Sequence, residues 1–107
     1  MVKVHIDNII DNKFFLNYLN FLIGRVYKIL PISESEPETL KSYLDSLILE
    51  LTGSKDLILK LKKDASFLSL IATLQALSEN QYSHSEIKRE VFKSINIIKK
   101  LINKYIT

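Results

Sequence analysis

Residues 14–31 read FFLNYLNFLIGRVYKILP, and this stretch decides the fold. Its apolar residues recur at intervals of three and four: Phe15, Leu19, Leu22, Val26 and Ile29. That spacing is the period of one helix face, so we expect a helix over residues 11–30. Pro31 is expected to end this helix, because the residue before a proline is pushed out of the α region.

A second helix is expected to begin at Ser35-Glu36-Pro37-Glu38, which has the pattern of a capping box with proline in the first turn. Gly53 stands where a left-handed C-terminal cap would end the helix. The residues between them form an apolar face made of Leu40, Tyr43, Leu44, Leu47, Ile48 and Leu51.

Two segments fit more than one structure. Residues 54–63 contain leucines that alternate like a strand, but the spacing of Leu57, Ile58 and Leu61 also fits a short helix, which we favour. Val2, Val4 and Ile6 alternate as well, and a lone strand would have no partner. The conformation of residues 1–6 therefore stays open.

Two further helices have clear N-terminal signals. Asp64 can cap a helix running to about residue 78, whose inward face is Phe67, Leu68, Leu70, Ile71, Leu74 and Leu77. After a break at Asn80, Ser83-His84-Ser85-Glu86 forms a second capping box. The last helix runs from there to about residue 105, and its apolar face is Ile87, Val91, Ile95, Ile98, Ile102 and Tyr105.

The composition agrees with one helical domain over residues 1–107. Only two glycines and two prolines occur, so the turn-rich punctuation of an all-β protein is missing. A content of 47% apolar and 25% charged residues fits neither a disordered chain nor an integral membrane protein. We predict an all-α, compact bundle of four to five helices, with a short extended N-terminal segment left open. The 11–30 helix is expected at its centre, with the last helix antiparallel beside it.

Most kinds of catalytic site lack their residues here. The absence of cysteine excludes disulfides, thiolate zinc sites and cysteine nucleophiles. His5 and His84 have no partner at metal-ligand spacing, and no serine is framed by glycines as a nucleophile. We therefore expect no enzyme, cofactor, metal site or small-molecule substrate. No export signal or membrane span is recognised, so the default location is the cytoplasm.

The 11–30 helix is apolar over about two thirds of its circumference, wider than the ~100° stripe that one side of a core needs. Either the other helices of the bundle cover both sides, or a second copy or partner covers the part around Phe14, Tyr18 and Phe21. Arg25 lies inside the apolar arc and is expected to pair with an acid of the second helix or to lie at an interface edge. The candidate protein interface is therefore Phe14, Tyr18, Phe21 and Arg25.

Cations gather on the last helix, opposite its isoleucine face: Lys88, Arg89, Lys93, Lys99, Lys100 and Lys104. This basic face fits a solvated surface, whose lysines near the helix C-terminus are stabilised by the helix macrodipole. It also fits a phosphate-binding face for DNA or RNA. The presence of a single arginine and the expected absence of exposed aromatic residues among the lysines weigh against nucleic acid.

The stretch at residues 15–31 and the string Lys88-Arg89-Glu90-Val91-Phe92-Lys93 resemble those of small helical proteins encoded in prophages and other mobile elements of low-GC Gram-positive bacteria. The resemblance implies an accessory protein that acts on a host or phage partner, and it carries no catalytic signature. It names no partner.

Together these patterns predict a noncatalytic protein–protein interaction module, acting as a homo-oligomer, an inhibitor or an adaptor. We expect a dimer with Tyr18 and Phe21 as its anchors, since large aromatic side chains carry much of the energy of an interface. The alternative is a nucleic-acid-binding regulatory protein that uses the basic face of the last helix.

Overall fold

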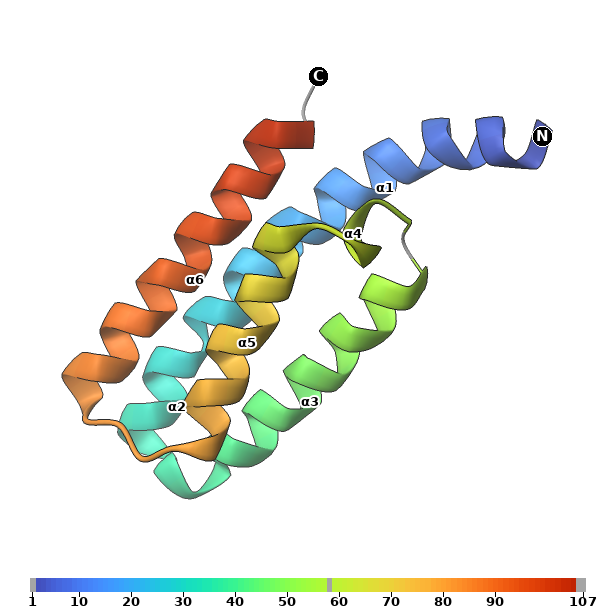
Figure 1. Ribbon diagram of the computed structural model, residues 1–107. Helices are drawn as coiled ribbons and strands as arrows, with labels where there is room; N and C mark the ends of the chain where they lie inside the picture. Colours follow the sequence, from blue (N-terminus) through green and yellow to red (C-terminus); the bar gives the residue numbers. More distant parts are fainter. Residues whose placement is uncertain (1, 58, 106–107) are drawn as a thin grey trace.

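Within the described residues, four long helices and two short ones make a bundle (Figure 1). The computed structural model describes residues 2–57 and 59–105, and the side chains of residues 13–55 and 61–105. In chain order the helices are α1 (Val2–Tyr27), α2 (Ile29–Ser35), α3 (Pro37–Leu57), α4 (Leu59–Lys62), α5 (Ala65–Glu79) and α6 (His84–Tyr105). No strand occurs in these ranges, which confirms the predicted all-α class.

The long helices form a ring in which each has two neighbours. Around the ring, α1 and α2 both pack beside α6, and α6 packs beside α5. Next comes α3, which packs beside α5 and closes the ring at α2. In Figure 1, α1 and α6 run in opposite directions, and the first turns of α1 extend beyond the other helices. The predicted antiparallel pairing of the first and last helices is therefore confirmed. The expectation that the first helix lies at the centre is wrong. The helix α1 is one member of the ring, and one of its sides faces solvent.

The core fills the inside of this ring and takes residues from every long helix. It contains the five residues that define the period of the first helix, and all five are fully buried. The buried hydrophobic residues are Phe15, Leu19, Leu22, Val26, Ile29, Leu44, Leu47, Leu51, Leu61, Phe67, Leu70, Ile71, Leu74, Leu77, Ile87, Val91, Ile95, Ile98 and Leu101. Leu68 was expected to face inward but is exposed.

The first helix differs from its prediction at both ends. Val2–Tyr27 is helical, so residues 2–6 do not form the extended segment that their alternation left open. The helix is interrupted at Lys28, and Pro31 lies inside α2 instead of ending the helix. Proline at position 31 has no N–H to donate to the carbonyl of Tyr27, and its ring crowds that carbonyl, so the break falls one turn before the proline.

The second predicted helix also has different ends. Ser35 belongs to α2, so the expected capping box does not form, although Pro37 does begin α3. At this junction the amide and hydroxyl of Thr39 both donate to the carbonyl of Glu36, each over 2.9 Å. Gly53 lies inside α3, and no glycine among the described residues has a positive φ, so the expected left-handed cap is wrong.

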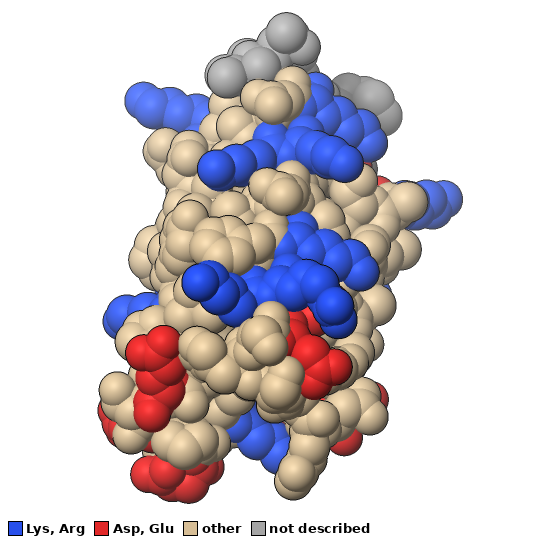
Figure 2. Space-filling view, turned by 90° about the vertical axis from the view of Figure 1, so that its left-hand side faces the viewer, with Lys and Arg blue, Asp and Glu red and all other residues tan. Residues whose placement is uncertain are grey.

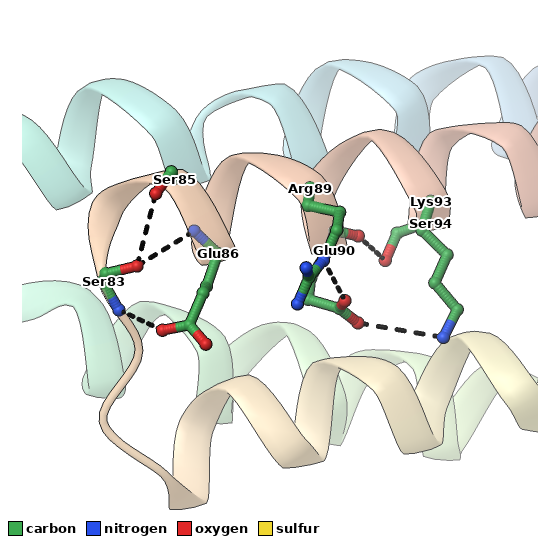
Figure 3. A network of polar contacts seen from close by, with 7 residues as sticks. All are labelled: Ser83, Ser85, Glu86, Arg89, Glu90, Lys93 and Ser94. Carbon is green, nitrogen blue, oxygen red and sulfur yellow. Dashed lines mark hydrogen bonds and ion pairs between the residues drawn. The ribbon is translucent and has the colours of Figure 1, made fainter.

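Two of the predicted helix caps are confirmed. The Asp64 carboxylate accepts hydrogen bonds from the amides of Ser66 and Phe67, over 2.9 and 3.1 Å. Figure 3 shows the second capping box, in which the amide of Ser83 donates to Glu86 over 2.8 Å and the amide of Glu86 donates to the Ser83 hydroxyl over 3.2 Å. In the segment between α3 and α5, Leu59–Lys62 forms the short helix that was favoured over a strand.

Candidate functional site

The candidate protein interface lies along the side of α1 that faces α3. Phe14 and Phe21 are seven residues apart, so their side chains lie on the same side of the helix, two turns from each other. They are 60% and 58% exposed, although both belong to the apolar arc of this helix. The other helices of the chain therefore leave these two rings uncovered. We refer to Phe14, Tyr18, Phe21 and Arg25 as the α1 surface.

Tyr18 and Arg25 attach the α1 surface to α3. The Tyr18 hydroxyl lies 2.8 Å from the Ser54 hydroxyl and 3.4 Å from a Glu50 carboxylate oxygen. Burial raises the pKa of Tyr18, and the hydrogen bond with Ser54 works in the opposite direction. Arg25 pairs with Glu50 over 2.8 Å, as expected for an arginine inside an apolar arc. Phe14 and Phe21 are thus the members of the α1 surface that stay largely exposed.

Arg25 also lies close to two aromatic rings. Its guanidinium carbon lies 5.7 Å from the centre of the Phe21 ring and 5.9 Å from that of Tyr43, within the range of cation–π contacts. The Tyr43 hydroxyl donates to the Arg25 carbonyl over 2.7 Å. The hydrogen bond with Glu50 holds the pKa of Arg25 above its ordinary value. Phe21 therefore lies beside an arginine whose charge is neutralised by Glu50.

The six cations of the basic face are all exposed, but they have different partners. Arg89 and Lys93 flank Glu90, over 3.5 and 3.8 Å (Figure 3), and Lys104 reaches Asp64 over 2.9 Å. The remaining three, Lys88, Lys99 and Lys100, form no ion pair within the part of the chain that the structure describes. Figure 2 shows Lys and Arg over the middle and upper part of this side of the molecule, with most of the carboxylates toward its lower end.

An aromatic pair that was not predicted from the sequence lies beside the basic face. Phe92 of α6 and Tyr27 of α1 are 39% and 42% exposed, and their ring centres lie 6.0 Å apart in an edge-to-face arrangement. The expectation that no aromatic residue is exposed among the lysines is therefore wrong. A signal was present, because Phe92 lies one helical turn after Lys88 and Arg89 and so shares their side of the helix.

A buried carboxylate joins the N-terminus of α5 to the C-terminus of α6. In addition to its two capping bonds, Asp64 accepts from Lys104 over 2.9 Å and from the Tyr105 hydroxyl over 2.6 Å. Burial works against its ionisation, but the hydrogen bonds from Tyr105, Lys104 and the Phe67 amide outweigh that effect and lower the pKa of Asp64. The cap was predicted, whereas its two partners on α6 were not.

Ser33, Glu34 and His84 meet where α2 passes the start of α6. His84 lies 3.1 Å from Glu34 through Nε2 and 3.4 Å from the Ser33 hydroxyl through Nδ1. That hydroxyl, however, donates to the Leu30 carbonyl over 2.9 Å, and the His84 and Glu34 side chains are open to solvent. A serine engaged in this way is not activated as a nucleophile by the histidine. His5 lies outside the described side chains.

A cavity of about 380 Å³ adjoins this group at the end of the bundle. Its polar lining includes Lys41, which donates to the Ser78 hydroxyl over 3.2 Å and pairs with Asp45 over 3.4 Å. Ser78 in turn donates to Asp45, and this hydrogen bond lowers the pKa of that carboxyl. These groups satisfy one another, so none is left aimed at a ligand.

Two kinds of site are absent from the described residues. Nowhere in them do three or more His, Asp or Glu side chains gather as a group that could hold a metal ion. Among the described helices, none combines the length and apolar character needed to cross a membrane. The chain matches no protein-family model, no curated protein and no solved structure at a significant level.

Proposed function

We propose that this chain is a noncatalytic protein–protein interaction module that forms a two-fold dimer through the α1 surface. The observation that carries the proposal is the exposure of Phe14 and Phe21, at 60% and 58%. Each ring leaves on the order of 100 Å² in water. A standard interface buries about 800 Å² on each partner, so the two rings would form its centre.

The charges around the α1 surface favour a second copy as the partner. In a two-fold contact the same patch meets itself, so a patch of one charge sign would repel its copy. Beside Phe21 lies Arg25, whose charge is neutralised by Glu50 across 2.8 Å. A two-fold contact through the basic face would instead place the six cations of one copy against the same six cations of the other. The α1 surface is thus the better candidate for self-association.

The dimer is proposed to act in the cytoplasm, on a host or phage protein, as an inhibitor or adaptor. Support for this role comes from the resemblance to small proteins of mobile elements. A protein partner that binds through an amphipathic helix would contact the same exposed aromatic residues, because such helices dock through apolar anchors at helical spacing. Dimerisation and partner binding would then compete for one surface.

Light scattering coupled to size-exclusion chromatography, at tens of micromolar protein, tests the dimer. We expect a mass of twice 12.4 kDa for the wild type, and a shift toward 12.4 kDa for Phe21→Glu, which places a charge at the centre of the contact. Leu68→Glu is the matched control, because Leu68 is also an exposed apolar residue but lies on α5. Circular dichroism establishes that both variants are folded.

Two results would contradict the proposal. A wild-type mass near 12.4 kDa would mean that Phe14 and Phe21 remain exposed in a monomer. A doubled mass that persists in folded Phe21→Glu would mean that the dimer uses another surface.

A further inference from the structure

The side of the molecule formed by α1 and α6 has an unusual charge distribution. The sequence contains no Asp or Glu between Asp11 and Glu34, or after Glu90, while Lys and Arg occur seven times in those two segments. Of these seven, Arg25 faces α3 and pairs with Glu50, which leaves six. Because α1 and α6 are neighbours in the bundle, the two segments come together. Figure 2 shows that cations dominate much of this side. A surface with one charge sign attracts a ligand of the opposite sign.

The cations of α6 extend along the helix and are partly free. From Lys88 to Lys104 the helix rises ~24 Å, which is long enough to follow several phosphates of a nucleic-acid strand. Lys88, Lys99 and Lys100 form no ion pair among the described residues, and Lys93 reaches Glu90 only at 3.8 Å. These lysines can be neutralised by an external anion without breaking a contact that the fold needs.

The aromatic pair supplies a second kind of contact on the same side. Phe92 and Tyr27 lie edge to face, 6.0 Å apart, and each keeps about two fifths of its surface exposed. Exposed Asn20 and Asn96 lie on the same side of their helices, two turns before Tyr27 and one turn after Phe92. Aromatic rings bordered by lysines and amides are the elements with which proteins hold unstacked bases next to a phosphate backbone.

We infer that the α1–α6 side is a binding site for single-stranded nucleic acid. Lys88, Lys93, Lys99 and Lys100 contact the phosphates, and a base stacks on the Tyr27–Phe92 pair. A single strand fits better than a duplex, because only an unstacked base can offer its face to a side chain. This site differs from the α1 surface, since Tyr27 lies about 120° round the helix axis from Phe21. A dimer formed through the α1 surface would thus keep both copies of the site open.

Fluorescence anisotropy with a labelled oligothymidylate, on the full chain at two salt concentrations, tests the inference. We expect saturable binding that weakens as salt rises, because each phosphate contact releases a counterion. The double variant Lys99→Gln/Lys100→Gln should weaken binding and reduce the slope of log K against log salt by about 1.4, at ~0.7 for each contact.

The aromatic contact requires a variant that keeps the packing. Phe92→Leu retains an apolar side chain against Tyr27 but removes the flat ring, so it should weaken binding on the order of tenfold and leave the salt slope unchanged. Phe92→Tyr keeps an aromatic ring and should bind the oligothymidylate with the affinity of the wild type. Leu68→Ala, at an exposed position on α5, is the matched control and should bind like the wild type.

Competition experiments separate this site from a nonspecific one. Unlabelled single strands should displace the probe better than a duplex of the same length or heparin. Equal displacement by heparin or by duplex would overturn the inference, since it would mean that the lysines attract any polyanion. The absence of saturable binding at low salt, or an unchanged affinity in Phe92→Leu, would overturn it as well.

Discussion

The most informative perturbation of the fold is the removal of the Asp64 carboxylate. This side chain is 1% exposed and joins two helix ends, since it caps α5 and accepts from Lys104 and Tyr105 near the end of α6. Asp64→Ala removes all four hydrogen bonds. Asp64→Asn keeps a side chain that caps helices equally well but carries no charge.

The expected cost follows from these contacts. Loss of an N-cap destabilises a protein by ~1 kcal/mol. Loss of a hydrogen bond between the Tyr105 hydroxyl and a charged acceptor costs a further ~2 kcal/mol. We therefore expect Asp64→Ala to lower the free energy of unfolding by about 3 kcal/mol, and Asp64→Asn by less, because the cap survives. For a domain of this size, ~3 kcal/mol lowers the melting temperature by roughly 12–20 °C.

Urea unfolding followed by far-ultraviolet circular dichroism measures these differences. Tyr105→Phe isolates one of the bonds, and its double variant with Asp64→Ala should cost less than the sum of the two single changes, because they share a contact. A loss below ~0.5 kcal/mol in Asp64→Ala would refute the reasoning, since that is the size expected of an ordinary surface change.

The same carboxylate predicts how stability depends on pH. Its pKa is lowered in the folded state from an ordinary value of 3.8, so the unfolded chain binds a proton first as the pH falls. The stability that Asp64 contributes is complete above that ordinary value and is lost as the pH falls through the lower, folded pKa. Wild type and Asp64→Asn should therefore differ at neutral pH and converge in strong acid, and a constant difference would contradict this assignment.

Three further predictions concern single helices and are measured by thermal or urea unfolding. Ser83→Ala removes the hydroxyl of the second capping box and should cost ~1 kcal/mol, whereas Ser83→Asp, which still caps, should be nearly neutral; equal losses in the two would argue against the cap. Gly24→Ala should stabilise the monomer by ~0.5–1 kcal/mol, because a Cβ there meets no atom within 4 Å; destabilisation would indicate that another chain approaches at that point. Leu74→Ala should cost ~3 kcal/mol through the cavity left at a fully buried position, and a loss under 1 kcal/mol would place Leu74 outside the core.

Features that depend on near neighbours along the chain could be predicted without the structure. The spacing of Phe15, Leu19 and Leu22 identified a buried helix face, because residues three and four apart share one side of a helix. Asp64 and Ser83 were identified as caps, because a cap bonds amides only two or three residues away. The pairing of Arg25 with an acid on the second helix followed from the cost of leaving a guanidinium unpaired in an apolar arc.

The packing of the helices, which local patterns do not specify, sets which apolar faces are covered and which distant groups meet. Gly53 lies inside α3 although the local pattern suggests an end, because α3 continues to Leu57. The Ser54 hydroxyl in this continuation meets Tyr18 of α1. Asp64 finds Lys104 forty residues away along the chain, and Tyr27 finds Phe92 on another helix. Periodicity shows that a helix has an apolar side, but the packing of the other helices determines how much of that side is buried. For this reason Phe15 lies in the core while Phe14, the residue beside it, remains in water.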